Sequence, residues 1–409
     1  MAAEIDSIVK KMLSGELKPH AAAEAAGGEK AASEARRIYL ERKYSSKLDF
    51  IKEADCDLED AGKRNIENAI GTIKMPLGFV ELLLGGRSVP VFLATTEGKL
   101  VAGINRGASA INSCGGAKVT ILKNAMTRSV IIETSGAADS ARIAAFISSA
   151  DGKKVIRDSF ALSSKRLELL DIETYATGRF LFVRYSADTK AAMGMNMLTI
   201  ATTEATKSLA EALGARGVAV RFLSESGNMC SDKKAAMINV IRGRGISVIA
   251  DAVITKEALE RYFKTDAAAI SELNYAKNYM GAALAGAIAH NAHAANMLAA
   301  LFIAYGQDPA QVVDGANAVD DAKAMENGDL YISVYLPSLE IGTFGGGTVR
   351  ETQKELLKAS GVYGEGDESG ATKLRFAEMI AATVLAGELN LLAAQARHEL
   401  ASAHQSLKR

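Results

Sequence analysis

Residues 180–213 read FLFVRYSADTKAAMGMNMLTIATTEATKSLAEAL, and this stretch decides the fold class. Its first part, 180–186, is an apolar run rich in aromatic residues and predicts a strand. Its last part, 198–213, has apolar residues at helical spacing and predicts a helix. The glycine-bearing turn at 192–197 would leave the free N–H groups of the helix N-terminus facing whatever binds there. A strand that leads through such a turn into a helix indicates an α+β fold.

The same mixture of strands and helices surrounds this stretch. The pattern predicts strands at 130–133, 167–175, 180–186 and 218–223, and helices at 140–149, 153–161 and 197–213. Together these segments form a compact α+β insertion within a longer chain.

The flanking regions differ in character. Residues 1–65 are predicted to be helical, because Ile5, Ile8, Val9 and Met12 recur at helical spacing, and the charged residues 34–47 resemble a solvated helix. Residues 73–102 contain short β-rich runs that predict a sheet. The apolar strand at 246–254 is followed by long Ala-rich helices.

The apolar segment 279–305 is predicted to be a helix buried in protein rather than a membrane span. It contains His290, His293 and Asn296, and such side chains are costly to bury in lipid without partners. The two histidines lack the glutamate of a zinc-binding helix and a third ligand, so no metal site is predicted.

Composition narrows the function classes. The 409-residue chain has 48 basic and 48 acidic residues, so no overall charge favours nucleic acid or an anionic membrane surface. Three cysteines without metal or redox spacing give no disulfide framework and suit a reducing, cytoplasmic setting. The N-terminus lacks the organisation of a signal peptide.

Two glycine-bearing loops have alternative interpretations. The turn at 192–197 suits a dinucleotide phosphate or ribose, but it lacks the G-x-G-x-x-G fingerprint and could be a Met-rich packing turn. Residues 342–348, GTFGGGT, contain three consecutive glycines that allow a close backbone approach to a ligand, or form a structural turn.

Four polar positions are candidates for chemistry. Glu97 follows a strand-like run, where a half-buried carboxyl group can become a proton donor, although a surface glutamate is the simpler interpretation. Lys233 and Lys234 could stabilise an oxyanion or could simply be solvated. His404, near the C-terminus, is either inert or a proton donor that closes over a site.

As an ordered set, these segments resemble 3-hydroxy-3-methylglutaryl-coenzyme A (HMG-CoA) reductases, in particular the soluble archaeal members of the eukaryote-like class. The collinear matches are ENAIG (67–71), ATTEG (94–98), NRG (105–107), MTR (126–128), AMGMNM (192–197), SGN (226–228), DKK (232–234), KN (277–278), NAHAAN (291–296), GQD (306–308), GTFGGGT (342–348) and LAGEL (385–389).

The resemblance implies catalytic roles for Glu97, Lys233 and His404, and adds Asp308. Lys233 would stabilise the oxyanion formed when hydride arrives, and Glu97 would supply the proton to that oxygen. Asp308 would belong to a hydrogen-bonded Glu–Lys–Asp cluster. His404 would protonate the departing coenzyme A thiolate.

The resemblance also implies binding residues. Those for the substrate are Arg106, Arg128, Ser226, Asp232, Lys234, Lys277 and Asn296. Those for NADPH, with NADH possible, are Ser164, Lys165, Met193, Gly194, Met195, Asn196, Gly345 and Gly346. Lys165 keeps the charge but not the bidentate fork of the family's arginine.

The sequence departs from the family pattern in three places. Residues 77–83 lack the family's A-G-P, Ala191 replaces the aspartate before A-M-G-M-N-M, and the tail after His404 differs from M-x-H-N-R. The changed residues 77–83 would alter contacts with coenzyme A, and Ala191 removes a polar contact near the nicotinamide. The changed tail would alter how the segment around His404 docks.

The domain organisation implied by the resemblance is a helical arm (1–65), a large substrate domain (66–128 and 232–409) around a long central helix at about 280–305, an inserted ferredoxin-like NADP-binding domain (129–223) and a catalytic loop (224–234). The family's site lies between subunits, so a homodimer or tetramer is expected.

The implied activity is reduction of HMG-CoA to mevalonate and free coenzyme A with NADPH, in isoprenoid synthesis. Two alternatives remain at this point. One is an NADH-linked enzyme that works in the mevalonate-degrading direction, and the other is a catalytically silent protein that binds nucleotide or coenzyme A.

Overall fold

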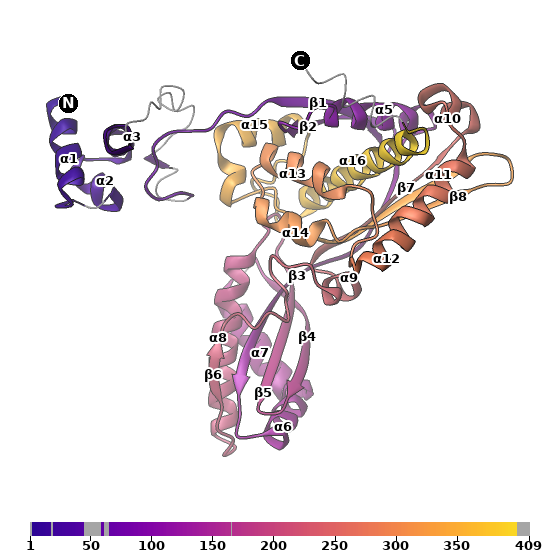
Figure 1. Cartoon of the computed structure of the whole chain (residues 1–409). Coiled ribbons are helices and arrows are strands. Elements are labelled where there is room, and N and C mark those ends of the chain that lie inside the picture. The colour runs from indigo at the N-terminus through magenta and orange to yellow at the C-terminus, as the bar shows by residue number, and fades with distance from the viewer. Residues whose placement is uncertain (1, 18, 45–58, 61–64, 165, 399–409) are drawn as a thin grey trace. The chain divides into compact units, whose positions relative to one another are not determined.

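The computed structural model describes residues 2–17, 19–44, 59–60, 65–164 and 166–398 (Figure 1). The chain forms two compact units. The N-terminal unit comprises Met1–Pro76 and Gly346–Glu355, and the main unit comprises Leu77–Gly345 and Leu356–Arg409.

The N-terminal unit is mostly helical over residues 2–17 and 19–44, whereas residues 65–76 form no helix or strand. It contains α1 (Ala2–Ser14), η1 (Pro19–Ala21), α2 (Ala22–Ala25), α3 (Glu29–Tyr44) and η5 (Gly346–Val349). As predicted, the apolar residues of α1 are buried. The prediction of a solvated helix at 34–47 is wrong for one face of α3. There Arg36 is 3% exposed, pairs with Glu29 and donates to the carbonyl of Ala69 at 3.1 Å, because a buried guanidinium needs such partners.

A seven-stranded antiparallel sheet runs through the main unit in the order β4-β5-β3-β7-β9-β8, with β6 paired to β3. The strands are β3 (Lys118–Glu133), β4 (Glu168–Thr177), β5 (Phe180–Asp188), β6 (Arg221–Ser224), β7 (Gly245–Ile254), β8 (Val319–Ala324) and β9 (Leu330–Leu339). The first half of β3 pairs with β7, and the second half pairs with β5 and β6. This one strand therefore joins a large lobe to a small lobe (Figure 1).

The small lobe is the predicted α+β insertion. It contains α6 (Ala137–Ser148), α7 (Ala150–Ser163), β4, β5, α8 (Met195–Gly214), β6 and the second half of β3. Its strand order is β4-β5-β3-β6 with every pair antiparallel, the order expected of a ferredoxin-like lobe. The lobe has its own apolar core, which includes Ile143, Phe160 and Leu198.

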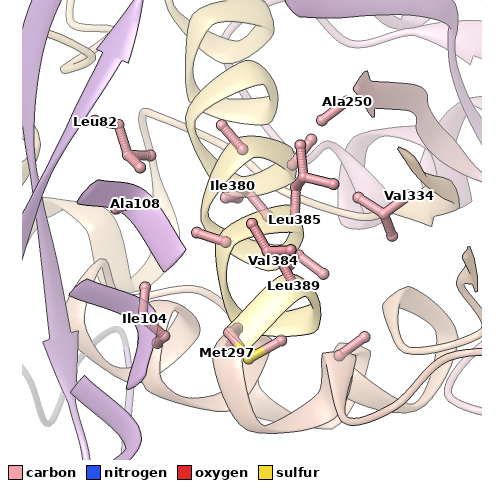
Figure 2. Close-up of a cluster of buried hydrophobic side chains, with 14 of the residues drawn as sticks. Leu82, Ile104, Ala108, Ala250, Met297, Val334, Ile380, Val384, Leu385 and Leu389 are labelled. Atoms are coloured by element: carbon pink, nitrogen blue, oxygen red, sulfur yellow. The ribbon is translucent and has the colours of Figure 1, made fainter. Parts of the chain in front are cut away.

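The large lobe is built around α16 (Ala371–Ala396). Figure 2 shows Ile104 and Ala108 on one side of this helix and Ala250 and Val334 on the other. The further elements of the lobe are β1 (Leu77–Leu84), β2 (Arg87–Ala94), α5 (Leu100–Ser113), α9 (Met237–Arg242), α10 (Lys256–Phe263), α11 (Ala267–Leu273), η4 (Pro309–Gln311) and α14 (Val312–Gly315). The helix α15 (Glu351–Ala359) begins in the N-terminal unit and ends in the main unit.

The prediction of a central helix at about 280–305 is wrong. That segment is divided into the end of η3 (Asn274–Gly281), α12 (Ala282–Ala285), a connection, and α13 (Ala294–Ala304). Gly286, with φ of 71°, ends α12 in a left-handed conformation. His290 and His293 lie in the connection rather than on one helix, and their backbone N–H groups bond to the carbonyl of Ala318 and the carboxylate of Glu388. Alanine-rich composition permits a helix, but these tertiary hydrogen bonds interrupt it.

Among the described residues, α16 is the one helix long and apolar enough to cross a membrane. However, 83% of its apolar window is buried inside the protein, which is the pattern of a core helix.

Candidate functional site

Lys233 and Asp308 form an ion pair at the centre of the candidate site. Nζ of Lys233 lies 2.7 Å from Oδ2 of Asp308, and their side chains are 44% and 32% exposed. The other carboxylate oxygen of Asp308 accepts the N–H of Ala310 at 3.0 Å and caps η4, which fixes the carboxylate. The hydrogen bond that Lys233 donates to Asp308 raises the pKa of Lys233, so the ammonium stays protonated while it remains accessible to a ligand.

The loop that presents Lys233 has an unusual backbone. Asn228, Ser231 and Lys233 have φ of 58°, 48° and 58°, in the left-handed region that non-glycine residues rarely adopt. The carboxylate of Asp314 holds the loop, because it accepts the N–H of Lys233 at 2.8 Å and that of Lys234 at 3.3 Å. Such a conformation persists only where the surroundings enforce it, and here they aim Lys233 at Asp308.

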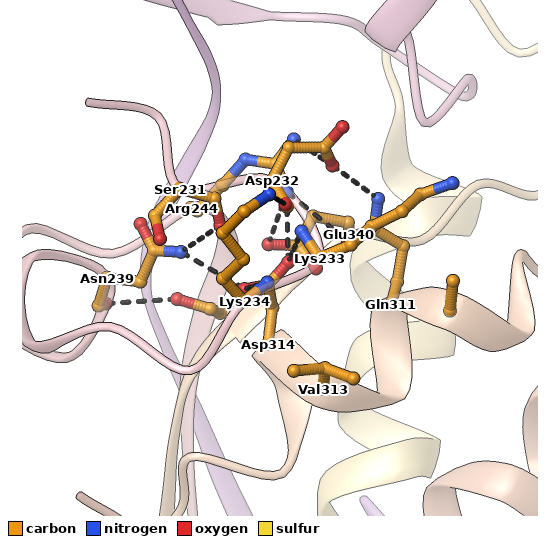
Figure 3. A network of polar contacts seen from close by, with 12 residues as sticks. Ser231, Asp232, Lys233, Lys234, Asn239, Arg244, Gln311, Val313, Asp314 and Glu340 are labelled. Atoms are coloured by element: carbon orange, nitrogen blue, oxygen red, sulfur yellow. Dashed lines mark hydrogen bonds and ion pairs between the residues drawn. The ribbon is translucent and has the colours of Figure 1, made fainter. Parts of the chain in front are cut away.

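Arg244 is the buried cation beneath this loop (Figure 3). Its guanidinium lies 3.0 Å from Asp232, 3.2 Å from Asp314 and 3.2 Å from Glu340. Gln311 joins the network by donating to Asp232 at 2.9 Å. The Arg244 guanidinium therefore pairs with Asp232, which precedes Lys233, and with Asp314, which accepts the backbone N–H of Lys233.

The three carboxyl groups around Arg244 differ in protonation. Burial raises the pKa of Glu340 well above its usual value, and burial also raises the pKa of Asp314. Burial opposes ionisation of Asp232 as well, but the charges of Arg244 and Lys233 and the hydrogen bonds from Gln311 and Arg244 together outweigh it and lower the pKa of that carboxyl group. Asp232 is thus the most firmly ionised partner, and Glu340 favours the neutral form.

Other predicted substrate residues surround the loop. Nη1 of Arg128 lies 3.9 Å from Oδ2 of Asp232, and Nζ of Lys234 donates to the backbone carbonyl of Asp232 at 3.0 Å. Ser226 is exposed in the turn after β6. Arg128 and Lys234 therefore bring cationic groups to Asp232, the residue that precedes Lys233, as binding of an anionic substrate requires.

A second cluster contains Glu97. Its Oε1 accepts from Nδ2 of Asn296 at 3.1 Å, and Asn296 also contacts Nδ1 of His293 at 3.3 Å. The buried carboxylate of Glu388 accepts the N–H groups of Ala292 and His293 at 2.6 and 2.8 Å. This carboxylate fixes the turn from which Asn296 reaches Glu97.

Lys277 belongs to the second cluster. Its Nζ donates to the side chain of Asn278 at 3.1 Å and to the carbonyl of Ala292 at 3.4 Å. Burial lowers its pKa. Nearby Asp320 is buried, and its pKa is raised well above the usual value by burial and by the negative charge of Glu388.

The two clusters lie at opposite ends of α13. Asn296 is in its first turn, whereas Asp308 follows its last turn. Eleven helical residues span roughly 16 Å. The structure therefore brings Lys233 and Asp308 together, and among the described residues no hydrogen bond connects Glu97 to either of them.

The two glycine-bearing loops pack against each other. The N–H of Thr343 donates to the carbonyl of Ala191 at 2.8 Å, and a Cβ on Gly342 would lie 2.5 Å from the nitrogen of Met193. Gly194 has φ of 86° and precedes α8, and the sulfur of Met195 lies 3.8 Å from Arg128. The loop at 192–197 thus adjoins the Lys233 cluster.

The remaining predicted residues are placed as follows. Arg106, on α5, donates to Asn390 at 2.7 Å and stacks on Phe263, so these contacts tie it to the interior of the large lobe. Asn196 is exposed at the start of α8, and Ser164 caps the end of α7. Gly345 is exposed in the main unit, and Gly346 belongs to the N-terminal unit. Lys165 and His404 lie outside the described residues.

Sequence reasoning missed the buried supports of the site, Arg244, Asp314, Glu340 and Glu388. Each is separated by many residues from the group that it holds. A charged residue inside an apolar run, such as Glu388 within α16, is the available signal, because a buried charge requires partners.

Comparison with known proteins identifies the family. The model of the hydroxymethylglutaryl-coenzyme A reductase family matches residues 32–409. A 3-hydroxy-3-methylglutaryl-coenzyme A reductase of Pyrococcus abyssi is 41% identical, with 99% of this chain and 100% of that protein covered. That of Methanocaldococcus jannaschii is also 41% identical over 99% of each chain, and reductase 1 of Hevea brasiliensis is 37% identical over 99% of this chain and 71% of its own.

Solved structures share the fold. A class II reductase of Streptococcus pneumoniae bound to NADPH in open conformations matches with a TM-score of 0.63 and 19% identity, covering 88% of this chain and 96% of that one. Another structure of the Streptococcus pneumoniae enzyme matches with a TM-score of 0.65 over the same shares. Fold, motifs and near-complete sequence coverage agree, and the chain belongs to the hydroxymethylglutaryl-coenzyme A reductase family.

Proposed function

We propose that this chain reduces HMG-CoA to mevalonate and free coenzyme A, with two NADPH and two protons consumed. The observation that carries this proposal is the 2.7 Å ion pair between Lys233 and Asp308 in a chain of this family. The loop that holds Lys233 has a left-handed backbone at that residue. A protonated, accessible ammonium in a fixed position is what a developing oxyanion needs.

In the proposed mechanism, Lys233 donates a hydrogen bond to the thioester oxygen and later to the aldehyde oxygen. Asp308 keeps the lysine protonated, and Glu97 provides the proton that this oxygen finally takes. His404 protonates the coenzyme A thiolate, so that the thiolate does not attack the aldehyde again. Arg128, Ser226, Lys234 and Lys277 bind the free carboxylate of the substrate, with Asp232 and Asn296 as their polar neighbours.

NADPH, when bound, supplies the hydride for each of the two reductions. The residues at 192–197 fit such a dinucleotide, because Gly194 has a positive φ and, within the part of the chain that the structure describes, no side chain caps the first N–H groups of α8. Gly345 offers open space where a Cβ would stand. With them, Met193, Met195, Asn196, Ser164, Lys165 and Gly346 form the proposed cofactor-binding set.

The separation of the clusters along α13 supports a site shared between subunits. Lys233 and Asp308 of one subunit would complete a site with Glu97 of a second copy, which requires at least a homodimer. The enzyme is proposed to act in the cytoplasm, in the mevalonate pathway. NADPH oxidation by the purified protein, measured with and without HMG-CoA, tests the function, and parallel assays with NADH and in the reverse direction test the direction.

A further inference from the structure

Lys373 is a buried cation that the proposed mechanism does not use. It lies in the first turn of α16, and it is 3% exposed. Burial disfavours an ammonium there, and so does the positive end of the helix dipole. Specific partners must therefore hold this charge.

Those partners lie at residues 189–192, at and just before the glycine-bearing turn 192–197. Nζ of Lys373 donates to the hydroxyl of Thr189 at 3.0 Å and to the carbonyl of Ala192 at 3.4 Å. The Thr189 hydroxyl itself donates to the carbonyl of Ala192 at 2.7 Å. The ammonium therefore orients the threonine hydroxyl and the loop carbonyl together.

Thr189 lies directly against the turn that begins α8. A Cβ on Gly194 would stand 2.3 Å from Cγ2 of Thr189, so the two residues are in close contact. From the other side, Thr343 donates to the carbonyl of Ala191 at 2.8 Å. Residue 191 is alanine where the family pattern has aspartate, so the side chain at that position cannot anchor the loop by a polar contact.

We infer that Lys373 is a positioning residue for the cofactor: its ammonium holds Thr189 and the carbonyl of Ala192, and thereby keeps the N–H groups at the start of α8 aimed at the dinucleotide. This inference rests on the proposed NADPH-dependent function. It predicts an effect on cofactor affinity that is separate from binding of HMG-CoA.

Protonation of Lys373 gives this role a pH dependence. The charged groups near its Nζ are Asp188, Lys190 and Asp367, and Oδ1 of Asp188 lies 3.9 Å away. Burial lowers the pKa of Lys373 to about 8. The ammonium is therefore present at neutral pH and is lost as the pH rises above this value.

The experiment measures NADPH dissociation constants by nucleotide fluorescence, in wild type, Lys373→Met and Lys373→Arg, from pH 6.5 to 9.5. Loss of a charged hydrogen bond predicts about tenfold weaker NADPH binding for Lys373→Met at neutral pH, with an unchanged KM for HMG-CoA. Wild-type affinity should fall above pH 8, whereas Lys373→Arg should bind without that fall. Lys153→Met, at an exposed position of α7, is the matched control.

Thr189→Val provides a second test that does not depend on folding of the lysine variants. It should also weaken NADPH binding, and the double variant should lose less than the sum of the two single losses. Wild-type affinity in a folded Lys373→Met or Thr189→Val variant would overturn the inference. Equal weakening of HMG-CoA and NADPH would also overturn it, and failure of the wild type to bind NADPH would instead reject the proposed function.

Discussion

The carboxylate of Asp314 accepts the backbone N–H groups of both Lys233 and Lys234, at 2.8 and 3.3 Å. Lys233 is thus held twice, through its backbone by Asp314 and through its ammonium by Asp308 at 2.7 Å. The first contact fixes a left-handed backbone, and the second sets the protonation of the side chain. Position and charge of the proposed oxyanion-stabilising group therefore depend on two different aspartates.

Replacement of Asp308 should change the pH profile as well as the rate. In Asp308→Asn, Lys233 loses the negative charge and the charge-assisted hydrogen bond that raise its pKa, so the lysine deprotonates at a lower pH. We expect kcat to fall about 10²-fold and the alkaline limb of the kcat/KM profile to move to lower pH. Steady-state assays across pH measure both effects.

Asp321→Asn, at an exposed position, is the control for loss of one negative charge. A folded Asp308→Asn variant with the wild-type rate and an unshifted alkaline limb would contradict the assigned role of the ion pair.

Arg244 should dominate the stability of the catalytic loop. In Arg244→Met, Asp232 and Asp314 lose the guanidinium that lies 3.0 and 3.2 Å away. Removal of one member of a buried ion cluster leaves charge unpaired and costs about 3–5 kcal/mol. Urea denaturation of Arg244→Met and wild type measures this difference, and a loss below about 1 kcal/mol would be inconsistent with the network.

Unlike Arg244→Met, Glu340→Gln should increase the unfolding free energy relative to wild type as the pH rises. The pKa of Glu340 is raised above 4.5 in the folded chain, so its contribution favours folding at low pH and is lost as the pH rises from the unfolded toward the folded value. The variant lacks this titration. Its unfolding free energy should therefore improve relative to wild type as the pH increases above 4.5. Denaturation curves of both proteins from pH 4 to 8 measure the unfolding free energy of Glu340→Gln minus that of wild type. A value that decreases as the pH rises would refute the prediction.

The sequence predicted helices and strands better than it predicted contacts between residues that are distant in the chain. Apolar periodicity between neighbouring residues predicted the strands and helices of the small lobe, the β-rich runs at 73–102 and the strand at 246–254. The ferredoxin-like arrangement of the small lobe was expected only from the family resemblance. The central helix was misplaced to 280–305, because both that segment and α16 are rich in alanine and composition does not report burial.

Within the site, the sequence motifs identified Lys233 and Asp308, and the structure brings them together. Arg244, Asp314 and Lys373 were not predicted. Arg244 lies 70 positions from Asp314, Asp314 lies 81 positions from Lys233, and Lys373 lies 184 positions from Thr189. No local pattern encodes such contacts.

The packing of α5 on α16 should depend on Gly107. A Cβ there would lie 1.9 Å from the carbonyl oxygen of Ala386, which is backbone and cannot move aside alone. Gly107→Ala should therefore destabilise the chain by about 2 kcal/mol or more, through strain and lost packing. Gly214→Ala, at the end of α8 where a Cβ meets open space, should be neutral or slightly stabilising. Equal melting temperatures for the two variants would contradict the close approach.

Mixed subunits test whether the site is shared. Glu97→Gln and Lys233→Met should each be inactive alone. If Glu97 of one copy serves Lys233 of another, random mixing should restore about a quarter of wild-type activity, because half of the dimers are hybrids with one intact site. Absence of any recovery in verified hybrid dimers would indicate that one chain supplies both residues.

The most direct test of the proposed function is the stoichiometry of NADPH oxidation with HMG-CoA as the limiting substrate. The account predicts that the purified chain oxidises two NADPH for each HMG-CoA and releases one free thiol, and that Lys233→Met abolishes both signals while remaining folded. A folded wild-type protein that shows no NADPH oxidation dependent on HMG-CoA, or a Lys233→Met variant that retains it, would contradict the account.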